Sequence, residues 1–293
     1  MKKIKILIPV YNDWLSVFKL LKVLDMRLQG WNRDIAHISV VIINDASTEK
    51  MPINIFTFNS LRLVQVINMK DNTGHARCIA AGLKYINENC DFDLVIPMDG
   101  DGEDRPSELG TLLCEAYEHS NLVVTANRIK RSEGLFFKFC YLFHKYLTFI
   151  FTGKLIKFGN FVCLPKLAVN KMVKEKSVWS SFSGAVAKLF KDRKSISSIR
   201  GKRYFGPSKM SFIKLLKHSL SIIAVFKITL LIRSIFFLIT YLFLIAGNLS
   251  LITLLPVIGV IIMMISVIIL SQRESILEFE NSLKNISSID QLK

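Results

Sequence analysis

Short apolar runs alternate with longer amphipathic segments through the first 130 residues of the chain. Five runs rich in Val and Ile predict strands buried on both faces, at residues 4–10, 39–43, 61–67, 94–98 and 122–125. Three segments of helical length lie between them, at residues 14–29, 75–87 and 106–119. Strands that alternate with helices in this way indicate an α/β fold built on a mostly parallel sheet flanked by helices.

A much longer apolar segment lies near the C-terminus, where Ser234 to Leu270 contains no charged residue. Because about 20 helical residues cross a bilayer core, this length predicts two transmembrane helices, at about 228–246 and 251–270. The turn formers Gly247, Asn248 and Ser250 lie between them. Basic residues flank the end to which both helices return, so the positive-inside rule places that end in the cytoplasm. These flanking residues are Lys227, Arg233 and Arg273.

The chain carries 39 Lys+Arg and 23 Asp+Glu, a formal net charge of +16. The surplus lies in one place: the net charge is −3 over residues 1–127, +18 over 128–217 and +1 over 218–293. A basic segment directly before a membrane hairpin favours anionic lipids or a phosphate-bearing substrate over nucleic acid as the partner. Five cysteines without a C-x-x-C pair are typical of reduced thiols, which indicates a cytosolic domain.

Two further segments combine basic and aromatic or aliphatic residues. Residues 134–153 hold eight Phe or Tyr and no acid, and residues 210–227 mix Lys and His with apolar side chains. Amphipathic helices of this kind typically lie in the headgroup region of a membrane. We therefore predict two interfacial helices. A core helix is the alternative for both segments, and a third membrane span is a further alternative at residues 135–152.

Polar clusters follow the first four predicted strands, at residues 9–13, 44–47, 71–77 and 99–106. The carboxyl ends of parallel strands meet at the edge of a sheet where ligands bind, so these clusters predict one binding site. Asp99 and Asp101 are suited to Mg²⁺ or Mn²⁺, which prefer oxygen ligands and share carboxylates with substrate phosphates. The five histidines show no metal-binding spacing and receive no role.

In this order the motifs P-V-Y-N-D, N-D-A-S, D-N-T-G and D-G-D-G-E-D-R-P resemble those of family 2 glycosyltransferases, which have the GT-A fold. The resemblance covers about residues 3–130 and implies a nucleotide-sugar donor, either a UDP- or a GDP-sugar. It implies that the donor contacts Pro9, Tyr11, Asp13, Asp45, Asn72, Gly74, Asp99, Gly100 and Asp101. Within that set, Asp45 is implied to contact the base, and Asp99 and Asp101 to hold the metal and diphosphate. Asn44 and Glu103 depart from the family's frequent residues and leave the donor open.

The resemblance extends to the acceptor side. Many family 2 members carry a carboxylate general base 80–100 residues after the metal pair, and residues 176–182 contain none. A phosphate acceptor needs no base, because it is largely dianionic at pH 7 and requires positive charge to hold it. Residues 200–210 resemble the R-x-x-G-x-S-K signature of polyprenyl-phosphate transferases of the dolichyl-phosphate-mannose-synthase type. We expect the acceptor phosphate to contact Arg128, Arg203, Ser208 and Lys209; the alternative is that these charges only face lipid headgroups.

The sequence thus predicts an inverting glycosyltransferase integral to the cytoplasmic or an ER-type membrane, with Asp99, Asp101 and Arg128 as catalytic residues. It would move a sugar to undecaprenyl or dolichyl phosphate. The expected organisation is a GT-A catalytic domain (1–209), an amphipathic helix (210–227), two transmembrane helices (228–270) and a cytoplasmic tail (271–293). Two alternatives stay open: transfer to a hydroxyl of a lipid or polysaccharide, and a non-catalytic nucleotide-sugar-binding scaffold. A homo-oligomer also stays open.

Overall fold

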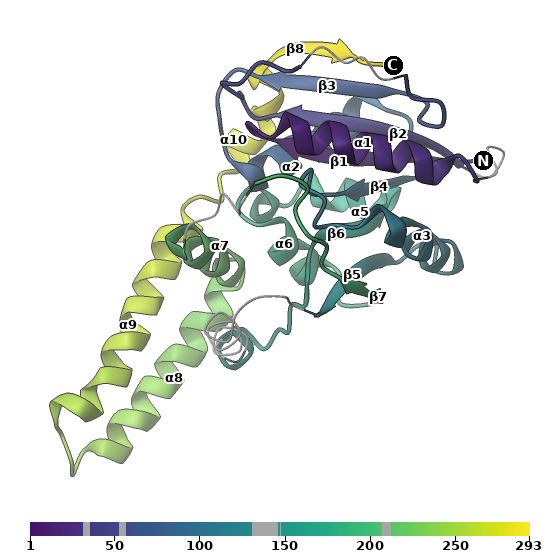
Figure 1. The fold of residues 1–293 in the computed structure, drawn as a ribbon. Coiled ribbons are helices and arrows are strands. Elements are labelled where there is room, and N and C mark those ends of the chain that lie inside the picture. Colours follow the sequence, from purple (N-terminus) through teal and green to yellow (C-terminus); the bar gives the residue numbers. More distant parts are fainter. Residues whose placement is uncertain (32–35, 53–56, 131–145, 147, 207–211) are drawn as a thin grey trace.

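The computed structural model describes residues 1–31, 36–52, 57–130, 146, 148–206 and 212–293. An eight-stranded sheet has the order β7-β5-β6-β4-β1-β2-β3-β8 (Figure 1). Its strands are β1 (Lys2–Val10), β2 (Ala36–Asn44), β3 (Val64–Met69), β4 (Leu94–Pro97), β5 (Val123–Lys130), β6 (Phe158–Pro165), β7 (Arg193–Ile199) and β8 (Ile286–Gln291). Among these described strands, only β6 and β8 run antiparallel to their neighbours. The predicted α/β fold with a mostly parallel sheet is confirmed.

Helices cover both faces of the sheet. On β1, Ile4, Ile6 and Ile8 belong to the core beneath α1 (Trp14–Leu28) and α3 (Leu109–Glu118). Leu7 points to the other face, which is covered by α2 (His75–Asn89), α5 (Lys166–Met172) and α6 (Phe182–Leu189). This alternation follows from the period of two in a strand, and it makes the sheet the middle of three layers. Two 3₁₀ turns complete these layers, η1 (Pro106–Glu108) before α3 and η2 (Lys176–Trp179) before α6.

Gly82 allows α2 to approach the sheet closely. A Cβ atom at this position would lie 2.4 Å from Leu7 Cδ1 and 2.9 Å from Ile43 Cγ1. Gly82→Ala is therefore expected to lower the free energy of unfolding by about 1–3 kcal/mol, the usual cost of overpacking a core. Thermal unfolding of the detergent-solubilised chain measures this, with Gly30→Ala as control because its Cβ would meet nothing within 4 Å. Equal stability of the two variants would contradict this packing.

Three helices follow β7: α7 (Phe212–Ala224), α8 (Lys227–Ile245) and α9 (Leu251–Ser271). The bounds of α8 and α9 differ from the predicted spans by one residue. Both helices are long and apolar enough to cross a membrane, and they project away from the sheet as a hairpin (Figure 1). The Ser250 side chain accepts a hydrogen bond from Thr253 N, which caps α9 directly after the turn.

The base of this hairpin contacts the chain before β6. Arg233 Nη1 of α8 donates a hydrogen bond to the Ile150 carbonyl at 2.8 Å. The Phe151 and Phe237 rings meet edge to face with centroids 6.2 Å apart. Helical residues 148–152 therefore pack against α8. Most of the predicted interfacial helix at 134–153 lies outside the described residues, and α7 occupies most of the second predicted segment.

The residues after the hairpin return to the sheet. They form α10 (Ile276–Glu280), the 3₁₀ turn η3 (Ser282–Asn285) and β8, which pairs antiparallel with β3 at the sheet edge. Phe279 of α10 is 1% exposed and stacks on Trp179 of η2 with centroids 5.6 Å apart. Within the segment expected as a tail, β8 thus extends the sheet and α10 packs against η2, so both ends of the hairpin join the same domain (Figure 1).

Candidate active site

The loops that follow β1, β2 and β3 are joined by hydrogen bonds at one edge of the sheet. Ser47 Oγ, after β2, accepts a hydrogen bond from the Asn12 amide, after β1, at 2.9 Å. Asp45 is 3% exposed, and its carboxylate accepts hydrogen bonds from the Thr73 and Gly74 amides after β3, at 2.8 and 2.9 Å. Asp45 therefore fixes the 72–74 loop, while its implied contact with a nucleobase stays a prediction.

The loop after β4 carries a dense group of carboxylates. The Asp104 side chain is buried and accepts a hydrogen bond from the Asp99 amide at 3.0 Å. Asp101 accepts one from the Glu103 amide at 2.9 Å. Asp99 accepts one from Asn160 of β6 at 3.0 Å. These bonds hold several negative charges within one short turn, which is unfavourable unless positive charge lies close by.

Arg203 supplies such charge from far along the chain. Its guanidinium binds Asp101 Oδ2 through Nη1 and Asp13 Oδ2 through Nη2, both at 2.6 Å. Arg128 of β5 lies 3.5 Å from Asp104, and Arg200 forms an ion pair with Glu103. Arg128 and Arg203, the two arginines predicted to bind an acceptor phosphate, therefore both lie at the carboxylate loop after β4.

The segment of residues 200–204 lies directly across the carboxylate loop. The Gly201 amide donates to the Glu103 carbonyl at 2.8 Å, and the Tyr204 amide to the Asp101 carbonyl at 2.9 Å. Gly102 has φ +89°, and a Cβ atom there would lie 2.5 Å from the Tyr204 ring. The second glycine of D-G-D-G is thus required both for its backbone conformation and for the close approach of Tyr204.

His75 also lies at this site, although no role was predicted for it. Its Nε2 is 3.3 Å from Asp99 Oδ1 and 2.8 Å from the Asn160 side-chain nitrogen. Partial desolvation would lower the pKa of His75, but the carboxylates of Asp99, Asp101 and Asp104 together outweigh this effect and raise it. Burial would raise the pKa of Asp99, and His75 with Arg128 holds it well below its usual range. The surroundings of Asp99 therefore favour its ionised form.

Asp101 behaves differently from Asp99. Burial and the neighbouring negative charge of Asp99 raise the pKa of Asp101 to about 6, against the opposing effect of Arg203. Burial and Asp99 likewise raise the pKa of Asp104. A bound cation would reduce the repulsion among these clustered carboxylates.

The site therefore fits a divalent cation. Among the described residues no three His, Cys, Asp or Glu side chains form a complete metal site. Asp99 and Asp101 would supply two carboxylates, and diphosphate and water the other ligands, as is usual for Mg²⁺. Arg203 already places positive charge on Asp101 Oδ2.

The raised pKa of Asp101 predicts a pH dependence of metal binding. Since the ion requires an ionised carboxylate, Mn²⁺ affinity is expected to fall about tenfold for each pH unit below about 6. The sign for stability is opposite to that of most carboxylates: the folded chain holds this proton more tightly, so ionisation of Asp101 lowers the free energy of unfolding as pH rises from about 4 to 6. Mn²⁺ titrations from pH 5 to 7.5, followed by electron paramagnetic resonance, measure the first effect. Constant affinity across this range would contradict it.

The other predicted residues are distributed as follows. Pro9 is the buried penultimate residue of β1, and Tyr11, which follows the strand, is 45% exposed. The Asn72 side chain donates to the Asp45 carbonyl at 3.0 Å. Ser208 and Lys209 lie outside the described residues. Sequence reasoning did not select His75, Asp104, Asn160 or Arg200. Asp104 lies inside the D-G-D-G-E-D-R-P motif, His75 directly follows D-N-T-G, and Arg200 begins the 200–210 segment, whereas Asn160 has no local signal.

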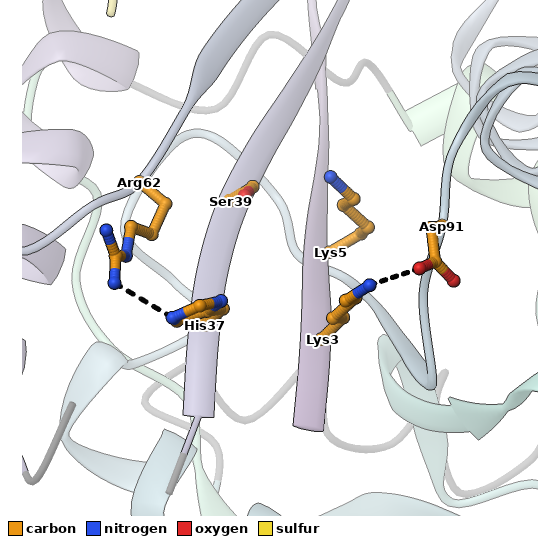
Figure 2. A pocket seen from close by; sticks show the side chains of 6 residues that line it. All are labelled: Lys3, Lys5, His37, Ser39, Arg62 and Asp91. Atoms are coloured by element: carbon orange, nitrogen blue, oxygen red, sulfur yellow. Dashed lines mark hydrogen bonds and ion pairs between the residues drawn. The ribbon is translucent and has the colours of Figure 1, made fainter. Parts of the chain in front are cut away.

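A separate hollow of about 240 Å³ lies at the opposite edge of the sheet, near the amino ends of the strands. Figure 2 shows its lining side chains, Lys3, Lys5, His37, Ser39, Arg62 and Asp91, with Arg62 bonded to His37 and Lys3 to Asp91. None of these residues belongs to the predicted motifs, so this hollow is distinct from the candidate active site.

Several known proteins resemble this chain. It is 26% identical over 230 residues to the glycosyltransferase YkcC of Bacillus subtilis, covering 75% of this chain and 67% of that protein. It is 27% identical over 223 residues to undecaprenyl-phosphate 4-deoxy-4-formamido-L-arabinose transferase of Klebsiella pneumoniae, covering 73% of this chain and 64% of that protein. The chain thus spans about two thirds of the length of these relatives.

Solved structures share the fold. Glucosyl-3-phosphoglycerate synthase of Mycobacterium tuberculosis, in complex with Mn²⁺, UDP and glucosyl-3-phosphoglycerate, has a TM-score of 0.53 at 14% identity, covering 79% of this chain and 80% of that one. The mannosyltransferase PcManGT of Pyrobaculum calidifontis, in complex with GDP-Man and Mn²⁺, has a TM-score of 0.51 at 13% identity, covering 97% of this chain and 87% of that one. The family described as glycosyl transferase family 2 matches residues 5–180, from β1 to the residue that follows η2. With its GT-A fold and this match, the chain belongs to glycosyl transferase family 2.

Proposed function

We propose that this glycosyltransferase transfers a sugar from a UDP- or GDP-sugar to polyprenyl phosphate at the cytoplasmic face of a membrane. One observation carries the proposal: Arg203, which precedes the apolar hairpin in the chain, reaches the predicted metal carboxylate Asp101. This contact links a cationic pre-hairpin segment to the place where the donor diphosphate is expected. The similarity to an undecaprenyl-phosphate transferase supports the same acceptor.

In the proposed reaction the acceptor phosphate is the nucleophile. One of its oxygens attacks the anomeric carbon, the bond from that carbon to the donor diphosphate breaks, and the nucleoside diphosphate leaves with inversion. A dianionic phosphate has no proton to lose, so no general base is needed. Arg128 and Arg203 would hold and orient it, since a guanidinium binds phosphate through two parallel hydrogen bonds.

Asp99 and Asp101 would hold Mg²⁺ or Mn²⁺, and the bound ion would stabilise the charge of the leaving diphosphate. Structures of M. tuberculosis and P. calidifontis proteins with this fold contain Mn²⁺ together with a nucleotide or nucleotide sugar. The His75–Asn160–Asp99 contacts keep Asp99 oriented and ionised for this role.

The apolar hairpin would anchor the enzyme in the membrane, with the domain of residues 1–209 at the cytoplasmic surface. The length and composition of α8 and α9 support this placement. The positive charge of residues 128–217 favours a surface rich in anionic lipids.

A transfer assay tests the proposal. The full chain in lipid nanodiscs is supplied with Mn²⁺, undecaprenyl phosphate and radiolabelled UDP- or GDP-sugars in turn. We expect a labelled lipid that mild acid hydrolyses, because a glycosyl phosphate linkage is acid-labile. A labelled product stable to mild acid would instead identify a hydroxyl acceptor, and nucleotide binding without transfer would identify a scaffold.

A further inference from the structure

A row of hydrogen-bonded side chains connects β8 to the loop after β2. Asp290 Oδ2 accepts a hydrogen bond from the Asn68 side-chain amide at 2.7 Å, and Ser288 Oγ lies 2.9 Å from the same nitrogen. Asn68 Oδ1 accepts one from the Asn44 side-chain amide at 2.8 Å. Asn44 Oδ1 accepts one from the Ser47 backbone amide at 3.0 Å. The row therefore crosses three adjacent strands, β8, β3 and β2.

The two ends of this row fix the direction of every bond in it. An ionised carboxylate such as Asp290 only accepts hydrogen bonds, and a backbone N–H such as that of Ser47 only donates. Between them, each asparagine must present its NH₂ group toward Asp290 and its oxygen toward Ser47. A carboxylate at position 44 would keep the bond from Ser47 but lose the bond to Asn68.

The row ends at the loops implied to bind the donor. The hydroxyl of Ser47 accepts the Asn12 amide at 2.9 Å, and Asn12 Oδ1 accepts the Glu49 amide at 3.1 Å. Asn12 has φ +50°, in the left-handed region that few L-residues other than Asn adopt, and these two hydrogen bonds hold it there. Its two chain neighbours are Tyr11 and Asp13, both implied to line the nucleoside pocket. Any shift of Ser47 is thus passed on to that pocket.

We propose that Asn44, Asn68 and Asp290 are positioning residues for the nucleotide donor, so that the strand after the apolar hairpin supports nucleotide binding. This inference rests on the proposed function, because it assumes that the pocket takes a nucleoside diphosphate. It also explains why position 44 holds Asn instead of the residue frequent in the family. The carboxylate of the row is that of Asp290 on β8, so the side chain at position 44 must donate a hydrogen bond.

A double-mutant cycle tests the proposal on the full-length chain in detergent with Mn²⁺, using UDP and GDP as probes in isothermal titration calorimetry. Asn44→Asp is expected to weaken binding of the preferred nucleotide about tenfold, because Asn68 must turn its NH₂ group toward position 44 and its oxygen then faces Asp290. Asp290→Asn alone is expected to change binding less than about threefold, since an amide oxygen still accepts the bond. In the double variant the amide introduced at position 290 donates to the turned Asn68, so the affinity is expected to return to within about threefold of wild type.

Rescue in the double variant is the decisive result, because two independent structural losses would add instead of cancelling. Asn89→Asp, which adds the same charge at an exposed site at the end of α2, is the matched control and is expected to bind as wild type. If wild type binds nucleotide and Asn44→Asp binds equally well, or if the double variant is as weak as Asn44→Asp, the proposal is overturned while the proposed function stands. If wild type binds neither UDP nor GDP, the proposed function fails and this inference with it.

Discussion

Asp101→Asn is expected to reduce sugar transfer by at least about 10³-fold, because it removes a carboxylate of the proposed metal site, where a bound ion would supply several kcal/mol of transition-state stabilisation. The amide has nearly the same shape, and Asp101 accepts its backbone bond from Glu103 through an oxygen that asparagine retains. The fold is therefore expected to persist. Initial rates of lipid labelling, together with Mn²⁺ titration, measure the effect.

Asp192→Asn is the matched control for this variant. Asp192 is exposed before β7 and outside the candidate site, so its loss is expected to leave transfer within about twofold. Transfer by Asp101→Asn within tenfold of wild type would remove Asp101 from the proposed metal site.

Arg203→Ala is expected to lower kcat/KM for polyprenyl phosphate by about 10²-fold, which is the effect expected when charge-assisted hydrogen bonds to a phosphate are lost. The kcat/KM of Arg203→Lys is expected to lie between those of wild type and Arg203→Ala, since an ammonium supplies a point charge without the bidentate geometry. Mn²⁺ binding is expected to change in the opposite direction. Without the guanidinium, Asp13 and Asp101 lose the cation that they share, so the metal ion is expected to bind more tightly in the absence of donor.

This divergence separates a direct role of Arg203 from damage to the site, which would weaken both processes. Kinetics with varied undecaprenyl phosphate and a parallel Mn²⁺ titration give the two readouts. Lys202→Ala is the control, because Lys202 is the exposed neighbour of Arg203. Unchanged acceptor kinetics in Arg203→Ala would show that this arginine serves the carboxylates alone.

The central strands and the carboxylate loop were predictable because their signals are local. Ile4, Ile6 and Ile8 lie in an apolar run, and Asp99 and Asp101 follow directly where such a run ends. The two apolar helices were predicted for the same reason, because few structures other than membrane-spanning helices fit a long uncharged apolar segment.

Other features depend on contacts between distant residues, and no local pattern encodes them. β8 has the bounds Ile286–Gln291, and its burial pattern lacks the apolar alternation of a core strand because it lies at the sheet edge. Arg203 contacts Asp13 across 190 positions of sequence. Asn160 reaches Asp99 only because β6 runs antiparallel beside β4. Position 160 has no neighbouring motif that would have indicated this role.

The pairing of β8 with β3 imposes an order on biosynthesis. β3 is synthesised early, whereas β8, which pairs with it, is synthesised only after both hairpin helices. The edge of β3 therefore stays unpaired while α8 and α9 are synthesised. An unpaired strand edge is a template for aggregation. The sheet can therefore be completed only after both apolar helices have been synthesised, so folding of the catalytic domain ends after synthesis of the hairpin.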